Sequence, residues 1–254
     1  VSIEAVHVNH HLHPDADAWA DSCVDFCVAN RLAYRVISVS VSEPDGLAGL
    51  ELRAREARYQ AFSQAVSHHD SGILLLAHHA QDQWETIMMR LAQGTGLAGL
   101  LGMQMTSIQR GIMVVRPMLG FSRQDCESYL HAFGLTGIED SSNTNESFTR
   151  GFIRKRLTPV VSSRWPQFAE TVSKQSRIWA EDFAAMDACV QQVLVQVTMH
   201  YYGLPYLSVE KLQHYPVAVR VVLLKSWLRA EGYKSPNHSK LVSFVTQAQQ
   251  ARSD

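Results

Sequence analysis

Short apolar strands alternate with amphipathic helices along the first half of this chain, and this alternation restricts the fold more than any other feature. Three strand patterns are each followed by a helical pattern: 3–9 by 16–30, 34–41 by 50–67, and 73–77 by about 80–91. Strands that alternate with helices pair in parallel and are covered by helices on both faces. The sequence therefore predicts an α/β fold built on a doubly wound parallel sheet.

The pattern becomes wholly helical after Trp165-Pro166. Before that point the chain shows one more strand, at 112–116, and a helix at 122–133 that Ser122 and Asp125 would cap. A change from a mixed to a helical pattern is typical of a domain boundary. We predict an α/β domain over 1–162 and a smaller all-α domain over 163–254.

Composition restricts the class of protein. The chain has 254 residues, 46% of them hydrophobic, and a formal net charge of -1, so its total charge gives no argument for nucleic-acid binding. Its four cysteines are too few for a disulfide scaffold, and it shows neither a signal peptide nor a membrane-spanning run, so we expect a soluble cytoplasmic protein. It begins at Val1, directly in a strand pattern, and we expect that upstream sequence has been lost.

The run from Ala77 to Thr86 carries the clearest chemical signal. It lies at a strand-to-helix junction, where open parallel sheets bind ligands, and it spaces His79, Asp82 and Glu85 three residues apart. Carboxylates in such a cleft suit a magnesium ion that is shared with nucleotide phosphates. The alternative is an ordinary helix start, in which the two acids complement the helix dipole.

Three further groups of residues each have two interpretations. Arg55 and Arg58 on one helix either grip phosphate or form a solvated face. The histidines near the first strand, with His78, His79 and Asp82, could be the metal ligands of a metallohydrolase, although their spacing matches no closed zinc site. The basic residues that follow Glu146 either bind a polyanion or belong to an ordinary helix: Arg150, Arg154, Lys155, Arg156 and Arg164.

Seven motifs in register resemble the bacterial tRNA(Ile)-lysidine synthetase family of the PP-loop, or N-type ATP pyrophosphatase, superfamily. The family's His-x-x-Asp-Gln-x-Glu-Thr element is met by His79, Asp82, Gln83, Glu85 and Thr86. The other six matches are Val8-Asn9-His10, the helix with Glu51, Ala54, Arg55, Arg58 and Tyr59, the stretch from Gly94 to Met103, Arg116-Pro117, the segment 139–143 with Arg150 and Arg154, and Trp165-Pro166. The resemblance is strong to about residue 170 and weak beyond it.

The resemblance implies a ligase that uses ATP and Mg²⁺. Such an enzyme adenylates the C2 oxygen of the wobble cytidine in a minor isoleucine tRNA with a CAU anticodon, and free L-lysine then displaces AMP. It implies a nucleotide-binding domain over 1–162 and a tRNA-contacting domain over 163–254. The implied roles are catalysis for His79, Asp82 and Glu85, metal binding for Asp82, nucleotide binding for His10, Arg55 and Arg58, and RNA binding for Arg116, Arg150 and Arg154.

The chain departs from the family pattern in three respects: His11 replaces a glycine, Gln93 and Gly151 replace an Arg and an Asn, and a loop is missing. The family's phosphate-gripping Ser-Gly-Gly-x-Asp-Ser loop is absent, and without it nucleotide binding should be severely weakened. We therefore expect that the chain is inactive alone. Two alternatives stay open beside the ligase, a non-catalytic tRNA-binding relative and a tRNA-thiolating PP-loop enzyme, and so does the formation of a homodimer.

Overall fold

The computed structural model describes residues 2–41, 47–68, 72–138 and 145–250. The chain divides into two compact units, Val1–Ile178 and Trp179–Asp254, which are treated separately below. The predicted acidic segment at 139–143 lies outside the described residues. No helix within the described ranges is long and apolar enough to cross a membrane.

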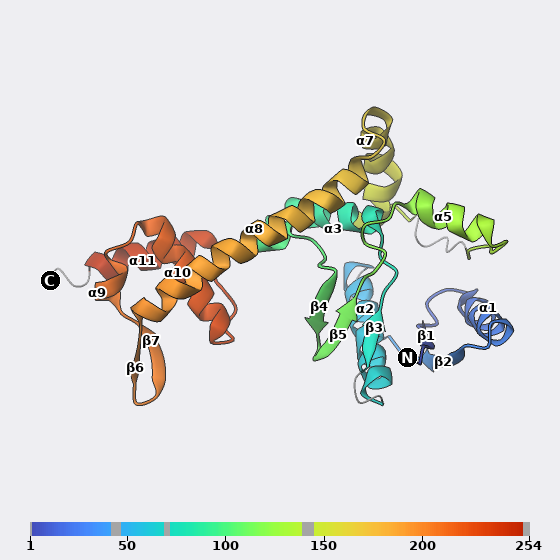
Figure 1. Ribbon diagram of the computed structural model, residues 1–254, viewed down its shortest axis with the longest axis horizontal. Helices are drawn as coiled ribbons and strands as arrows, with labels where there is room; N and C mark the ends of the chain where they lie inside the picture. Colours follow the sequence, from blue (N-terminus) through green and yellow to red (C-terminus); the bar gives the residue numbers. More distant parts are fainter. Residues whose placement is uncertain (1, 42–46, 69–71, 139–144, 251–254) are drawn as a thin grey trace. The chain divides into compact units, whose positions relative to one another are not determined.

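The strands of the first unit form two small sheets. β1 (Glu4–Asn9) pairs in parallel with β2 (Ala33–Ser38), and α1 (Ala16–Ala29) connects them. β3 (Ile73–Leu75) pairs in parallel with β5 (Ile112–Val115), and β4 (Thr106–Gln109) adds to β5 in antiparallel fashion (Figure 1). The mixed α/β character is as predicted. The prediction of one continuous doubly wound sheet is wrong for the described strands, because none of them pairs with both β1 and β3.

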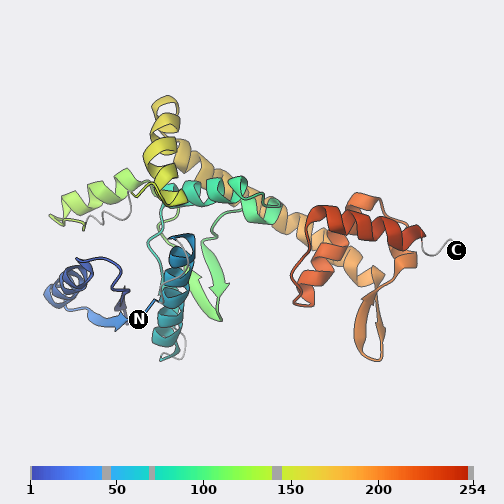
Figure 2. The ribbon, with the colours of Figure 1, turned by 180° about the vertical axis from the view of Figure 1, so that it is seen from behind.

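Helix α2 (Leu47–Ser67) supplies the core between these sheets. Its Tyr59 and Phe62 pack with Leu74 of β3 and with Ile112 and Val114 of β5, and Val6 and Val8 of β1 pack against the same cluster. The two rings of α2 meet edge to face, with centroids 6.1 Å apart. One apolar face of α2 therefore contacts both sheets, and α2 runs between them (Figure 2). The strand ends that carry the predicted site belong to one compact unit.

Helix α3 (Ala80–Ala92) packs against the helices that follow the sheets in this unit. The buried Trp84 ring meets Phe168 edge to face at 4.7 Å, and its indole N–H donates to the Thr158 hydroxyl at 3.2 Å. Phe168 begins α8 (Phe168–Val197) and Thr158 begins α7 (Thr158–Arg164). These contacts join α3, α7 and the start of α8. The remaining helices of the unit are α4 (Leu97–Leu100), α5 (Arg123–Ala132), α6 (Thr149–Phe152) and a π-helix (Ile153–Leu157).

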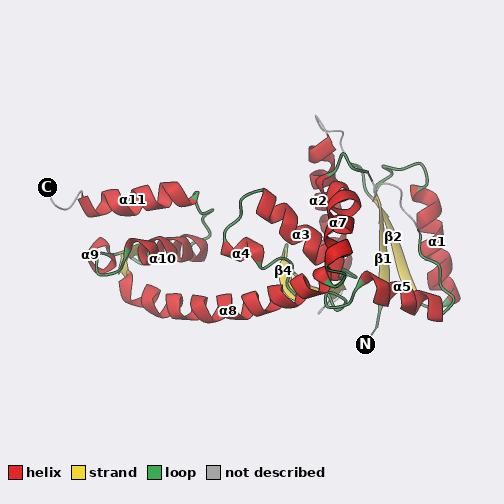
Figure 3. Cartoon of the chain, turned by 90° about the horizontal axis from the view of Figure 1, so that it is seen from above, coloured by secondary structure: helices red, strands yellow, loops and turns green. Residues whose placement is uncertain are grey.

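The second unit is mostly helical. It contains α9 (Val209–Leu212), α10 (Val217–Ala230) and α11 (His238–Gln250), and α10 lies beside α11 (Figure 3). Val221 and Leu224 of α10 pack with Leu241 and Val245 of α11. The prediction of an all-α unit is wrong in one element, the antiparallel hairpin of β6 (Thr198–Tyr201) and β7 (Leu204–Leu207). Tyr202 and Gly203 both have positive φ, as a two-residue hairpin turn requires.

Candidate active site

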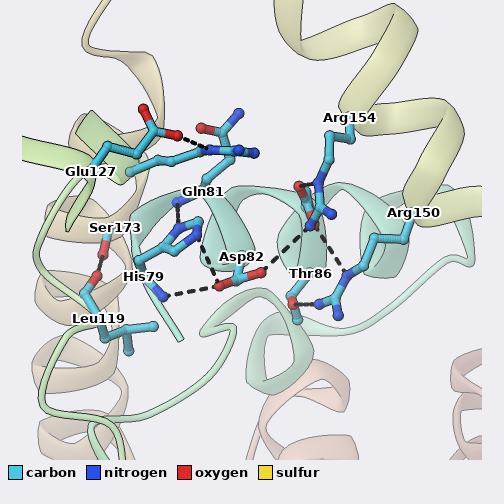
Figure 4. Close-up of polar contacts among 11 residues, drawn as sticks. His79, Gln81, Asp82, Thr86, Leu119, Glu127, Arg150, Arg154 and Ser173 are labelled. Atoms are coloured by element: carbon cyan, nitrogen blue, oxygen red, sulfur yellow. Dashed lines mark hydrogen bonds and ion pairs between the residues drawn. The ribbon is translucent and has the colours of Figure 1, made fainter. Parts of the chain in front are cut away.

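The predicted acids lie on the first turns of α3, where His79 and Asp82 form a reciprocal helix cap. The Gln81 backbone N–H donates to His79 Nδ1 at 3.2 Å, and the His79 backbone N–H donates to Asp82 Oδ2 at 3.0 Å (Figure 4). Because Nδ1 accepts a hydrogen bond, the ring proton is assigned to Nε2, which lies 3.6 Å from the same Asp82 oxygen. These two residues therefore start the helix, and the cap orients both side chains, while their predicted catalytic roles stay predictions.

Glu85 has different surroundings, although it lies only three residues further on. Its side chain is completely buried, and Arg154 donates to both carboxylate oxygens at 2.8 Å. Burial disfavours a charged guanidinium, but the hydrogen bonds and charge of Glu85 outweigh it and raise the pKa of Arg154. Arg150 adds an ion pair at 3.2 Å to Glu85 and a hydrogen bond at 3.0 Å to Thr86. Glu85 therefore holds two arginines against α3.

Asp82 is the acid of this group that keeps some solvent access. Its side chain is 15% exposed, and its Oδ1 atom lies 3.7 Å from Arg154 Nη2. That oxygen accepts no hydrogen bond from another described residue, whereas Oδ2 caps the helix. A ligand that approaches the start of α3 therefore meets one available carboxylate oxygen beside a guanidinium.

The predicted nucleotide-binding residues form a second group. His10 follows β1, and Arg58 on α2 donates from Nε to its Nε2 atom at 3.2 Å. Burial, together with the charges of Arg58 and His7, lowers the pKa of His10 to about 4, so the ring is neutral near pH 7. Arg55 lies one turn away with its guanidinium over the Tyr59 ring, 4.9 Å from the centroid.

His78, to which the sequence assigns no role in the ligase site, lies between these groups. Burial lowers its pKa to about 4, and the positive charges of Arg116, Arg150 and Arg55 act in the same direction against the opposing charge of Asp82. The charges of three guanidinium groups thus act on a neutral imidazole, and such positive surroundings favour an anion. Several buried polar atoms also lack a hydrogen-bond partner among the described residues, namely His10 Nδ1, His78 Nδ1, Tyr59 Oη and Arg116 Nε. Such atoms suit a polar ligand.

Arg116, predicted to bind RNA, is only 2% exposed. Its Nη1 atom donates to the Gln104 carbonyl at 2.8 Å and to the Ser107 hydroxyl at 3.0 Å, which fixes the approach to β4. Because it is buried, its positive charge acts on His78, whose pKa it helps to lower, and is not displayed on the protein surface. Its contact with RNA stays a prediction.

Gln83 matches the family motif but received no predicted role, and the structure gives it a supporting one. Its amide Nε2 donates to the Met103 carbonyl at 2.9 Å and to the Ser176 hydroxyl at 2.8 Å, and its Oε1 accepts from the Met103 N–H at 2.7 Å. Gly102 has φ of +65°, and a Cβ there would lie 2.6 Å from the Gln83 amide. The motif's glutamine therefore ties the glycine-rich stretch and the start of α8 to α3.

The described residues contain no group of three or more His, Cys, Asp or Glu side chains that could hold a metal ion. The histidines after β1 are thus not gathered into one ligand set. His11, for example, pairs with Asp17 at 3.2 Å on the surface. A metallohydrolase built on these histidines receives no support from this arrangement.

Comparison with known proteins places this chain in a family. The PP-loop domain matches residues 1–161. The whole chain is 33% identical to a tRNA(Ile)-lysidine synthase of Yersinia pseudotuberculosis serotype O:1b (strain IP 31758) and 32% identical to one of Shigella flexneri, and it covers 55% and 57% of those proteins. The chain thus spans about half the length of these curated relatives.

A solved structure is similar in fold. The U34-tRNA thiolase from Methanococcus maripaludis superposes with a TM-score of 0.51 over 70% of this chain and 62% of its own, at 14% sequence identity. At that identity the likeness concerns the fold alone, and it supports the α/β character of the chain.

Proposed function

We propose, from the premise that this chain belongs to the PP-loop domain family, that it serves the ATP-dependent ligation of lysine to the wobble cytidine of a minor isoleucine tRNA. Identity to tRNA(Ile)-lysidine synthases extends over all 254 residues and so includes the helical second unit. The observation that carries the proposal is the row of His79, Asp82 and Glu85 on α3, with Arg150 and Arg154 held against it.

The arginines of the first unit suit the nucleotide. Arg55, Arg116 and Arg150 act together on His78, and Arg58 contacts His10 at the end of β1. Phosphate oxygens would occupy this positive region, and the neutral imidazoles would add hydrogen bonds without further charge. We assign Arg55, Arg58 and His10 to ATP, as the family resemblance implies.

Asp82 fits a magnesium ion only as a single ligand. One of its oxygens caps α3, and the other lies beside Arg154. Mg²⁺ commonly takes one or two carboxylates and completes its shell with phosphate oxygens and water. Bound in this way, the ion would neutralise charge on the phosphates, and Asp82 would hold it at the start of α3.

The reaction requires activation followed by displacement. Attack of the cytidine C2 oxygen on the ATP α-phosphorus forms one P–O bond and releases pyrophosphate, which turns that oxygen into a leaving group. The lysine ammonium group loses one proton, its ε-amine forms a C–N bond at C2, the C2–O bond breaks as AMP departs with the oxygen, and the new C–N nitrogen loses a second proton. Once pyrophosphate and the ion had left, the freed Asp82 oxygen would hold the ammonium group and accept a proton. We assign Glu85 the positioning of Arg150 and Arg154, because Arg154 occupies both of its oxygens.

A tRNA-thiolating enzyme is the weaker candidate. Thiolation needs a reactive thiolate, but burial and the neighbouring Cys27 raise the pKa of Cys23, and burial and Asp125 raise that of Cys126. These thiols are therefore protonated at neutral pH. Cys27 is itself buried, and Cys189 lies in the second unit.

The proposal is tested by following AMP and pyrophosphate release with ATP, Mg²⁺, lysine and a CAU-anticodon isoleucine tRNA. The protein is the product of the whole reading frame, so that the result does not depend on where the present sequence begins or ends. Pyrophosphate release should require the tRNA, AMP release should require both tRNA and lysine, and both should stop when the wobble cytidine is replaced by uridine. Binding of the tRNA without release of either product would support the non-catalytic alternative.

A further inference from the structure

The junction of α7 and α8 carries a cavity that the proposed reaction does not use. It has a volume of about 500 Å³ and is lined by Arg164, Trp165, Pro166, Gln167, Phe168 and Thr171. This volume is within the range of sites that bind small organic groups. All six residues belong to the first unit, so the cavity does not depend on the placement of the second.

Trp165 is held in place but remains open to solvent. Its backbone N–H donates to the Val161 carbonyl at 2.9 Å, and its carbonyl accepts from the Phe168 N–H at 3.0 Å. Its indole lies 6.2 Å from the Phe168 ring, which is itself anchored on Trp84. The side chain of Trp165 is nevertheless 58% exposed. A fixed, exposed indole at a cavity is a ready stacking surface for a flat ligand.

The charges beside the indole favour an anionic partner. Arg164 and Lys174 form no ion pair with any residue in the described ranges, and Lys174 lies on the same face of α8 as the cavity-lining Thr171, three residues before it. Glu170 is the acid of the first turn of α8, so the local balance stays positive. The basic residues of α6 and the π-helix precede this junction in the same unit.

We propose that this cavity holds one unpaired nucleobase of the bound RNA, stacked on Trp165, with the flanking phosphates facing Arg164 and Lys174. An aromatic platform next to unpaired cations is the chemistry that recognises single-stranded RNA. The inference rests on the proposed function, because it takes the RNA to be the tRNA substrate. It adds a base-binding subsite outside the row on α3.

The test measures binding of a fluorescent RNA hairpin with a CAU anticodon loop. The hairpin is used intact and in versions where each loop nucleotide in turn is abasic. Trp165→Ala should weaken binding of the intact hairpin about tenfold, as loss of one stacked base does, and Trp165→Phe should recover most of that loss. Tyr129→Ala, which removes an aromatic ring of similar exposure (62%) from α5, is the matched control and should bind like the wild type.

The abasic hairpins separate stacking from a general loss of structure. At one loop position, removal of the base should weaken hairpin binding to the wild type about tenfold. The same removal should not weaken binding to Trp165→Ala, because this variant has already lost the stacking surface. Should Trp165→Ala fail to fold, the comparison is made with Trp165→Phe instead. Removal of the base at that one loop position should then reduce the difference in hairpin affinity between the wild type and Trp165→Phe. Equal losses at every loop position in both proteins would overturn the subsite.

The outcomes also distinguish this inference from the proposed function. If tRNA-dependent AMP release occurs but Trp165→Ala binds RNA as tightly as the wild type, only the base-binding subsite is wrong. If the wild-type protein neither binds the hairpin nor releases AMP with tRNA, both the function and the subsite are wrong.

Discussion

Arg154 donates two hydrogen bonds of 2.8 Å to the two carboxylate oxygens of Glu85, whose side chain is completely buried. The two residues are 69 positions apart, so this pair fixes the basic π-helix against α3. A buried carboxylate with a bidentate guanidinium costs little while the pair is intact and much when one partner is removed. The Glu85–Arg154 pair therefore couples the stability of the fold to the site.

Glu85→Gln should lower the free energy of unfolding toward the lower end of the about 3–5 kcal/mol that breaking a buried pair costs, because Arg154 stays partly exposed and keeps Asp82 at 3.7 Å. Arg154→Gln should cost a similar amount, and the double variant should cost clearly less than the sum. Urea unfolding of the four proteins gives the coupling. Glu146→Gln is the control, since this carboxylate pairs with Lys155 and Arg156 at the surface and should have a small effect. Additive losses would show that the pair is not a unit.

Asp82→Asn should lower the rate of tRNA-dependent AMP release by about two orders of magnitude or more, as loss of a positioned acid–base group does. Its cost in stability should be only about 1 kcal/mol, that of a weakened helix cap. Asp125→Asn removes the same kind of cap from α5, where Ser122 takes the place of His79. Loss of activity in both variants would point to helix capping rather than chemistry at Asp82.

Stability should fall as the pH drops from about 6.5 toward about 4, because His78 and His10 stay neutral in the folded protein. As the pH falls, the two imidazoles bind protons near pH 6.5 in the unfolded chain but only near pH 4 in the folded protein. Their contribution to the free energy of unfolding is therefore complete above the unfolded pKa and is lost as the pH falls below it. His78→Gln should flatten this decline relative to the wild type in urea unfolding followed across that range. An unchanged slope would mean that His78 is not buried among Arg55, Arg116 and Arg150.

The affinity for tRNA should depend steeply on salt, because phosphate contacts release counterions. Lys155→Gln with Arg156→Gln removes two cations that are exposed on the π-helix, and the slope of log affinity against log salt should flatten by about one to two units. This pair is preferable to Arg150 with Arg154, whose loss would leave Glu85 buried and unpaired. Arg110→Gln with Arg123→Gln, on the exposed turn after β4 and on α5, should leave the slope unchanged.

Local features could be predicted from the sequence because they depend on residues close to one another. The 3.6-residue period located α1, α2 and α3, and the Ser122 and Asp125 spacing predicted the cap of α5, which is confirmed. The Tyr202-Gly203 turn was a short-range signal too, but the helical pattern on both sides of it concealed the hairpin.

Burial at the candidate site could not be predicted in the same way. Asp82 and Glu85 share one motif and one helix face, yet Asp82 stays partly exposed while Glu85 is completely buried. The difference arises because α6 and the π-helix pack over the second turn of α3, through contacts between residues more than sixty positions apart. Periodicity within one helix contains no information on such a contact. For the same reason the role of His78 appears only when Arg55, Arg116 and Arg150 are placed around it.

The most direct test of the account is the appearance of lysidine itself. The product of the whole reading frame is incubated with ATP, Mg²⁺, isotopically labelled lysine and CAU-anticodon isoleucine tRNA, and the tRNA is digested to nucleosides for mass spectrometry. The account predicts a labelled lysidine nucleoside that replaces one cytidine, and loss of that signal in Asp82→Asn but not in Asp125→Asn. A wobble cytidine that stays unmodified, under conditions in which the protein binds this tRNA and ATP, would contradict it.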